Sequence, residues 1–207
     1  MIAIIDYGAG NLTSVKLALD ALHATAEVTR SADRILAAER VIFPGVGAAG
    51  AAMQNLRQMG LIEAIRAVIA RGTPFLGICV GTQVMFEFSE EDGGTPCMGL
   101  ISGQVKLFHP ASRYDKVPQI GWNSVSLRRP HPVLSGIDSG SEFYFVHSYY
   151  PAPSGKEVIV GETEYADAKF ASIVADRSLV ATQFHPEKSG RRGLKLLGNF
   201  LRWDGKA

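Results

Sequence analysis

The five-residue run Gly77-Ile78-Cys79-Val80-Gly81 constrains the fold of this chain more than any other segment. It lies between an apolar segment and a second segment that predicts a helix, and its glycines permit a tight turn with close approach of helix to strand. This is the pattern of a nucleophile elbow, a sharp strand-to-helix turn with a nucleophile at its tip. A buried structural cysteine, the common alternative, would need neither glycine. The run therefore predicts a strand over 74–78, Cys79 at the turn and a helix over 82–88.

The first half of the chain alternates short apolar runs with amphipathic segments. The apolar runs predict buried strands at 2–5, 26–29, 40–43 and 74–78. The segments between them predict helices that begin near residues 11 and 31, and one or two further helices between residues 53 and 72. His23 falls inside the first of these predicted helices. This β-α-β-α order predicts a parallel sheet covered by helices on both faces.

The second half has a different texture. After Gly93-Gly94, short runs separated by turn residues predict antiparallel or mixed strands near 105–108, 122–127, 143–146, 158–161, 170–174 and 179–182. A last helix is predicted over 190–203. No linker is long enough to divide the chain, so we expect one domain over residues 1–207. The expected class is α/β, with a central, mixed, largely parallel sheet flanked by helices and an antiparallel, strand-rich second half.

Composition excludes several classes of protein. The net charge of the 207 residues is +1, which does not favour a nucleic-acid or membrane-surface partner. No apolar run approaches the roughly 20 residues that cross a bilayer, and residues 1–6 indicate a strand and not a signal peptide. The two cysteines, Cys79 and Cys97, do not form a disulfide framework, so we expect a reduced, cytoplasmic setting. Neither a metal ion nor a cofactor is predicted.

The run His185-Pro186-Glu187 supplies the partners that a thiol nucleophile needs. A thiolate in acyl transfer requires an imidazole to take and return protons, and a third group to orient that imidazole. In extended backbone, residues i and i+2 point to the same side, so Glu187 is expected to contact the His185 ring. His109 and His131 precede prolines in loop-like segments and are given no catalytic role. His147 is ambiguous between a core residue and a substrate contact.

A tetrahedral intermediate needs hydrogen-bond donors for its oxyanion. One candidate is the backbone N–H of Val80, the residue after the predicted nucleophile. The others are the amides of Val46 and Gly47, in a glycine-containing loop at the end of the strand over 40–43. A plain β-to-α turn is the alternative reading of that loop.

The stretch Gly-Ile-Cys-Val-Gly-Thr-Gln at 77–83, together with His-Pro-Glu at 185–187, resembles the triad-type glutamine amidotransferases. Within that family, the chain is similar to the glutaminase subunits of imidazole glycerol phosphate synthases. That similarity rests on the stretches at 5–12, 44–47, 118–123 and 143–149. Thr82 departs from the pattern, since an apolar residue is expected there.

The resemblance implies a flavodoxin-like fold and an activity. Cys79 would attack the side-chain amide of glutamine, His185 would act as base and acid, and Glu187 would orient His185. The ammonia would pass to a (β/α)8-barrel cyclase subunit, in a heterodimer that serves histidine biosynthesis. The resemblance also implies substrate contacts and partner contacts. The expected glutamine-binding residues are Gln83, Glu91, Ser148 and Tyr149, and the expected interface residues are Asn11, Trp122, Tyr144 and Lys188.

Three alternatives stay open on the sequence. The chain could serve another amidotransferase, for tryptophan, folate, pyrimidine, purine or pyridoxal phosphate synthesis. It could be a free-standing thiol hydrolase, or a binding or regulatory module that keeps the elbow as scaffold. The stretches at 5–12 and 121–123 argue against the first alternative, and the presence of Cys79, His185 and Glu187 argues against the last.

Overall fold

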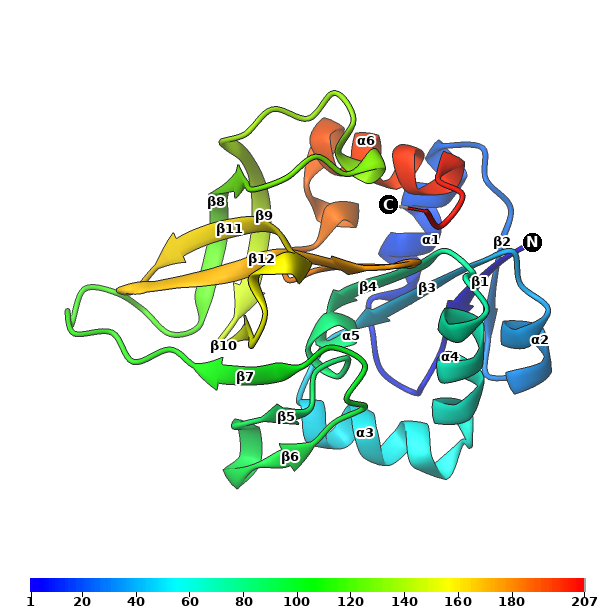
Figure 1. Cartoon of the computed structure of the whole chain (residues 1–207), viewed down its shortest axis with the longest axis horizontal. Coiled ribbons are helices and arrows are strands. Elements are labelled where there is room, and N and C mark those ends of the chain that lie inside the picture. The colour runs from blue at the N-terminus through cyan, green and yellow to red at the C-terminus, as the bar shows by residue number, and fades with distance from the viewer. Residues whose placement is uncertain (207) are drawn as a thin grey trace.

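The computed structural model describes residues 1–206 and is built around a nine-stranded sheet (Figure 1). The strand order is β2-β1-β3-β4-β13-β12-β11-β8-β9. The strands are β1 (Ile2–Ile5), β2 (Ala26–Thr29), β3 (Arg40–Gly45), β4 (Phe75–Cys79), β8 (Gln119–Leu127), β9 (Ser141–His147), β11 (Ile159–Tyr165), β12 (Ala168–Asp176) and β13 (Leu179–Thr182). β2, β1, β3, β4 and β13 are parallel, and the pairs from β13 to β9 are antiparallel. This confirms the α/β class with a mixed sheet.

Helices cover both faces of the parallel part of the sheet. α1 (Leu12–Ala21) and α6 (Gly190–Arg202) lie together on one face. α2 (Ala32–Leu36), α3 (Ala49–Gln58) and α4 (Leu61–Ala70) lie on the other (Figure 1). Strands that are covered on both sides have no solvent-facing face, which explains why β1, β4 and β13 are buried throughout and, except for Thr182, contain no polar side chain other than the Cys79 thiol.

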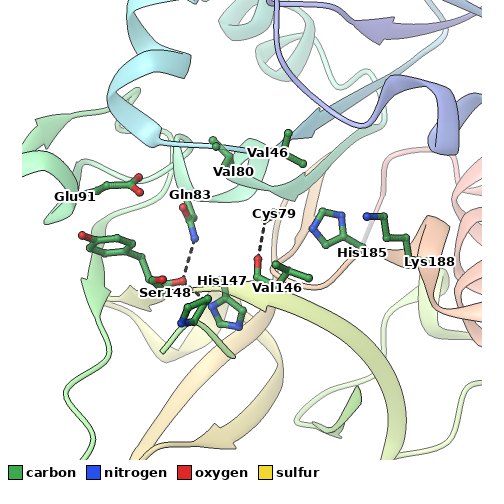
Figure 2. A pocket seen from close by; sticks show the side chains of 13 residues that line it. Val46, Cys79, Val80, Gln83, Glu91, Val146, His147, Ser148, His185 and Lys188 are labelled. Atoms are coloured by element: carbon green, nitrogen blue, oxygen red, sulfur yellow. Dashed lines mark hydrogen bonds between the residues drawn. The ribbon is translucent and has the colours of Figure 1, made fainter. Parts of the chain in front are cut away.

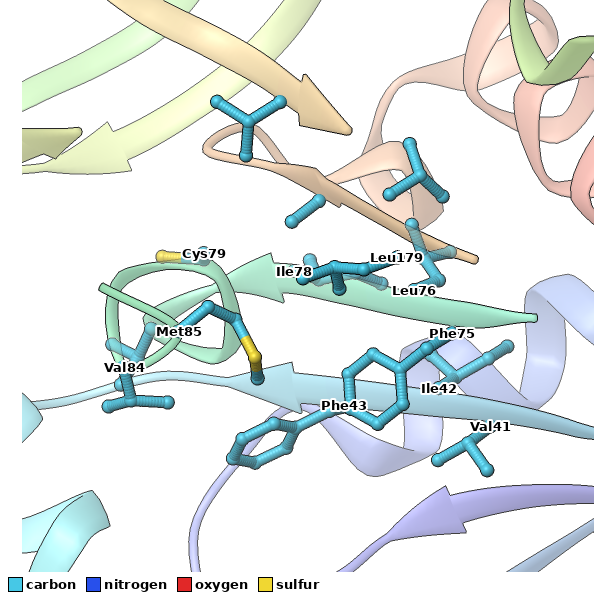
Figure 3. Packing of buried hydrophobic residues seen from close by; sticks show 14 of the residues in the cluster. Val41, Ile42, Phe43, Phe75, Leu76, Ile78, Cys79, Val84, Met85 and Leu179 are labelled. Atoms are coloured by element: carbon cyan, nitrogen blue, oxygen red, sulfur yellow. The ribbon is translucent and has the colours of Figure 1, made fainter. Parts of the chain in front are cut away.

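The core beneath the elbow is packed with aromatic and branched side chains. Figure 3 shows Phe43 on β3 and Phe75 on β4 in contact, with Val84 and Met85 below Cys79. The two rings lie edge to face with centroids 6.4 Å apart, an arrangement that aromatic pairs favour. All four of these apolar side chains are fully buried. The end of β4 therefore sits on a rigid base.

A second sheet lies beside the first (Figure 1), and of its four strands the sequence predicts only one, near residues 105–108. It has the order β10-β7-β5-β6 and consists of β5 (Phe88–Ser89), β6 (Thr95–Pro96), β7 (Gly103–Leu107) and β10 (Tyr149–Pro153). The 3₁₀ turns of the chain are at Glu91–Gly93, Pro132–Leu134, Lys156–Val158 and Pro186–Lys188. Two-residue strands carry too little periodicity to be recognised in a sequence.

The predicted helix over 82–88 is wrong. The helix behind Cys79, α5, covers only Val80–Gln83. The carbonyls of Val84, Met85 and Phe86 accept hydrogen bonds from the amides of residues 98–101, so they are not available to a continuing helix. His23 is a smaller correction, because it follows the end of α1 in a left-handed conformation (φ 55°).

The crossing of α5 over β3 and β4 leaves no space for a side chain at Gly81. A Cβ atom there would collide with the carbonyl oxygen of Phe43, while at Gly45 it would lie 2.6 Å from the Gly81 nitrogen. These contacts are with backbone atoms, which cannot rotate away. The glycines of the elbow are therefore required by packing, as the sequence predicts.

We expect Gly81→Ala to destabilise the fold by about 3 kcal/mol or more, because the backbone must move to admit the methyl group. Gly198→Ala is the matched control, since a Cβ there would make only ordinary contacts at 3.7 Å within α6. Alanine should stabilise that helix by about 0.5–1 kcal/mol. Urea unfolding of both variants measures the two effects, and equal effects would contradict the packing argument.

Candidate active site

Cys79 lies at the tip of the turn between β4 and α5, in a strained backbone conformation with φ 54° and ψ −112°. A positive φ is uncommon for a residue other than glycine, and such strain is concentrated at functional sites. The side chain is largely buried, at 5% exposure. The elbow thus holds the sulfur at the carboxyl end of the parallel strands, where open α/β sheets form their sites.

Pairing of β13 with β4 brings His185 to the same place. The two strands are parallel, with Thr182 opposite Ile78, so the residues after β13 emerge beside Cys79. The His185 amide then donates to the Tyr144 carbonyl at 2.9 Å, which fixes the segment against β9. Cys79 and His185 line one cavity.

His185 and Glu187 form a buried pair. Nδ1 of His185 lies 2.8 Å from Oε1 of Glu187, and the two side chains are only 4% and 1% exposed. The predicted contact is therefore present, but its predicted backbone is wrong. Pro186–Lys188 is a 3₁₀ turn and not an extended segment, with His185 at its N-cap. A 3₁₀ turn is tightly wound, with three residues per turn, so it brings the Glu187 carboxylate close to the His185 ring.

The surroundings of His185 favour its protonated form. Burial opposes the charge, but hydrogen bonding to the Cys79 sulfur and to Glu187 outweighs burial and raises the pKa of His185 to about 10. An imidazolium beside a cysteine stabilises the thiolate, which is the nucleophilic form. The sulfur, ring and carboxylate are thus arranged in the order that a thiol acyl-transfer site requires.

A cavity of about 280 Å³ opens above the sulfur (Figure 2). Figure 2 shows His185 and Lys188 to one side of Cys79, and Gln83 and Glu91 to the other. The walls come from six separate segments of the chain and are formed by Val46, Gly47, Cys79, Val80, Gln83, Glu91, Pro118, Val146, His147, Ser148, Tyr149, His185 and Lys188. A cavity of this size accommodates a small polar molecule such as an amino acid.

The three residues predicted to supply oxyanion donors, Val46, Gly47 and Val80, all line this cavity. Val46 and Gly47 follow β3, whose last residue Gly45 lies opposite Cys79 in the sheet. Gly47 has φ 91°, and a Cβ atom there would meet no atom within 4 Å. The loop is exposed, and a hydrogen bond of 3.4 Å from the Tyr7 hydroxyl to the Val46 carbonyl ties it to the core.

The four predicted glutamine-binding residues also line the cavity. Glu91 is held in place by the Ala49 amide, which donates to its Oε2 at 2.6 Å. Burial raises the pKa of Glu91. Gln83 is buried, and its Nε2 donates to the Tyr149 carbonyl at 3.0 Å. Thr82, the departure from the family pattern, uses its hydroxyl to bond the Thr182 carbonyl at 2.6 Å, which links α5 to β13.

Two buried side chains at the site were not assigned a role from the sequence. Gln183 is fully buried, and its Nε2 lies 3.7 Å from the Cys79 sulfur. His147 is neutral at pH 7, because burial lowers its pKa to about 4, and its Nδ1 lies 2.7 Å from the Tyr149 carbonyl. The sequence did contain a signal for Gln183. It stands two residues before His185, and in an extended segment residues i and i+2 point to the same side.

Three of the predicted interface residues lie on elements that meet beside the cavity. Trp122 on β8 is 55% exposed and lies opposite Tyr144 on β9, with ring centroids 6.0 Å apart. Ile120, on the same face of β8, is 64% exposed. Lys188 lies in the 3₁₀ turn that contacts both β9 and α1, and Asn11 immediately precedes α1. An apolar patch of Ile120, Trp122 and Tyr144 thus borders the cavity.

Residues 1–206 contain no cluster of three or more His, Cys, Asp or Glu side chains placed to hold a metal ion. In this same part of the chain, every helix is too short or too polar to cross a membrane.

The family model for class-I glutamine amidotransferases matches residues 3–203. The imidazole glycerol phosphate synthase subunit HisH of Dehalococcoides mccartyi strain CBDB1 is 48% identical over 202 residues, covering 98% of this chain and 97% of the relative. The HisH subunit of Moorella thermoacetica is 52% identical over 199 residues, covering 96% and 93%. The chain belongs to the class-I glutamine amidotransferase family.

Solved structures agree with this fold. A crystal structure of a glutamine amidotransferase superposes with a TM-score of 0.75 at 17% identity, covering 98% of both chains. The structure of PurLQS from Thermotoga maritima gives 0.73 at 16% identity, covering 97% of both chains. At these identities the likeness concerns the fold alone.

The raised pKa of His185 predicts how stability depends on pH. The pKa is about 6.5 in the unfolded chain and about 10 in the fold, so protonated His185 stabilises the fold fully below about pH 6.5, and this contribution is lost as the pH rises through about 10. Glu187→Gln removes one cause of the shift. We expect this variant to lose most stability near pH 6 and least near pH 10, as measured by urea unfolding. A loss that is independent of pH would contradict this assignment.

Proposed function

We propose that this chain is the glutaminase subunit of an imidazole glycerol phosphate synthase and hydrolyses glutamine through Cys79, His185 and Glu187. The shared cavity of Cys79 and His185, with the His185 ring held 2.8 Å from the Glu187 carboxylate, carries the proposal. HisH subunits that are 48–52% identical over nearly the whole chain support the choice of synthase.

Each group is proposed to take one step of the reaction. The Cys79 thiolate attacks the side-chain carbonyl carbon of glutamine, and the amides of Val80 and of the loop at Val46 and Gly47 bind the oxyanion that forms. His185 gives its proton to the leaving nitrogen, and ammonia departs as the C–N bond breaks. His185 then takes a proton from water, which attacks the thioester. The C–S bond breaks, glutamate leaves, and the Cys79 thiolate and the protonated His185 are restored.

Gln83, Glu91, Ser148 and Tyr149 are proposed to hold the amino-acid end of glutamine. Figure 2 shows Gln83, Glu91 and Ser148 on the side of Cys79 away from His185, and Tyr149 lines the same cavity, so a substrate bound there presents its side-chain amide to the sulfur. Glu91 offers a carboxylate for the substrate ammonium. The Ser148 hydroxyl offers a donor for the substrate carboxylate, and Oε1 of Gln83, whose two N–H groups are already bonded, offers a second acceptor for the ammonium.

The partner is proposed to be a (β/α)8-barrel cyclase that binds over the cavity mouth and receives the ammonia. The apolar patch of Ile120, Trp122 and Tyr144 supports this site, because exposed aromatic residues anchor protein interfaces. Lys188 lines the cavity and is exposed, so a partner seated there would contact patch and cavity rim together. A cytoplasmic heterodimer follows from this proposal.

The rival functions make different use of these features. Synthases for tryptophan or purines would share the triad but not the 48–52% identity to HisH subunits. A free-standing thiol hydrolase would have no need of an exposed aromatic patch at its cavity. A binding module would not need the strained backbone of Cys79 or the buried pair behind it.

We expect Cys79→Ala to abolish glutamine hydrolysis, with a loss of at least about 10³-fold, while the complex with the cyclase still uses added ammonia. The alanine removes the nucleophile but leaves the fold and the partner surface unchanged. Glutamate release and product formation from ammonium salts measure the two activities. Loss of both activities in a folded variant would assign Cys79 a structural role.

We expect Trp122→Ala to weaken association with the cyclase by about 2 kcal/mol without lowering the thermal unfolding midpoint. Leu17→Ala is the matched control, because Leu17 is 62% exposed but lies on α1 beside β2, at the opposite edge of the sheet. Titration calorimetry with the purified cyclase measures both. An unchanged affinity for the Trp122 variant would exclude the patch as the docking surface.

A further inference from the structure

A chain of buried hydrogen bonds runs behind the cavity from the Tyr149 carbonyl to the Cys79 sulfur. The Nε2 of Gln83 lies 3.0 Å from the Tyr149 carbonyl oxygen and 3.0 Å from Oε1 of Gln183. The Nε2 of Gln183 lies 3.7 Å from the sulfur. In Figure 2, the Gln83 side chain points from α5 toward the segment that carries Ser148. The chain joins the wall of the cavity to its predicted nucleophile.

The direction of every bond in this chain is fixed by the backbone carbonyl at its end. A carbonyl oxygen only accepts, so the Gln83 amide must present Nε2, and not Oε1, to Tyr149. The second N–H of that nitrogen then points to Gln183, so Oε1 of Gln183 must be the acceptor. This leaves the Nε2 of Gln183 pointing at the sulfur. The amide of Gln183 is therefore a donor at Cys79.

The sulfur lies between this donor and an acceptor. The Val146 carbonyl oxygen is 3.9 Å from Sγ, where it can accept from the thiol. A carbonyl oxygen favours the protonated sulfur and an N–H favours the thiolate. Gln183 is completely buried, and a buried carboxamide is costly unless its polar atoms are bonded. A methionine or leucine would fill the same space without that cost, so packing alone does not explain a glutamine here.

We propose that Gln183 is a positioning residue for Cys79. Its N–H, held in direction by Gln83, donates to the sulfur and stabilises the thiolate in the orientation from which attack begins. The inference rests on the proposed function only in taking Cys79 as the nucleophile. The side-chain amides of Gln83 and Gln183 connect the cavity wall at Tyr149 to the nucleophile. Gln83 therefore influences the Cys79 sulfur in addition to lining the cavity.

The test is the pH dependence of Cys79 alkylation by iodoacetamide in the full chain. Labelled peptides are identified by mass spectrometry. Burial raises the pKa of Cys97, the other cysteine, to about 11, which keeps it slow to react. We expect Gln183→Met to lower the rate at Cys79 about tenfold near pH 7, as loss of a hydrogen bond to a charged group predicts, and the deficit to shrink as the pH rises. Ser178→Ala is the control, since it removes a buried hydrogen bond just before β13, at the end away from the site, and should leave the profile unchanged.

A second variant keeps the test decisive if Gln183→Met does not fold. Gln83→Met leaves Gln183 in place but removes the partner that fixes its direction, so the alkylation rate should fall here too. If both single variants fold, the double variant should react no more slowly than Gln183→Met, because the two amides act as one unit. A wild-type alkylation profile in either folded single variant overturns the inference. Failure of the proposed function would show separately, as glutamine hydrolysis that survives Cys79→Ala.

Discussion

The parallel pairing of β4 with β13 is the interaction on which the rest of this structure depends. It joins residues 75–79 to residues 179–182, about half the chain apart, and places the segment after each strand at the same edge. Both strands are fully buried, so the pairing is held by the core and not by the site itself. The sulfur and the imidazole are consequently brought together before any substrate is present. A preformed arrangement of this kind spares the reaction the cost of assembling its groups.

The elbow shows how packing and chemistry share the same residues. Gly45, Gly77 and Gly81 let α5 lie against β3 and β4, and Cys79 has its strained conformation at the turn that joins β4 to α5. The short length of α5 follows from the next loop, whose amides bind the carbonyls that a longer helix would use. The position of the site is therefore set by how the backbones of β3, β4 and α5 cross, and the functional side chains lie at the ends of these elements.

Much of this could be predicted from the sequence, because strong local signals coincide with the main elements. The strands at 2–5, 26–29 and 179–182 have the predicted bounds, since each is a short segment rich in apolar or β-branched residues and bounded by turn or polar residues. Most of the second sheet and the end of α5 could not be predicted, because hydrogen bonds to distant residues decide them. Gln183 was missed for a related reason. A glutamine does not mark a strand, a helix or a site in a sequence pattern. Its partners, Gln83 and Cys79, are about a hundred positions away along the chain.

The nine-stranded sheet ends at β9, and the residues around His185 close that edge. The His185 amide donates to the Tyr144 carbonyl at 2.9 Å, and the Tyr144 amide donates to the Ser189 hydroxyl at 3.0 Å. Backbone groups that would otherwise be a template for another strand are thereby occupied. The same short segment thus protects the molecule from edge-to-edge aggregation and carries its acid–base pair. Substitutions that loosen this segment would therefore uncover the Tyr144 backbone on the edge strand as well as disturb the acid–base pair.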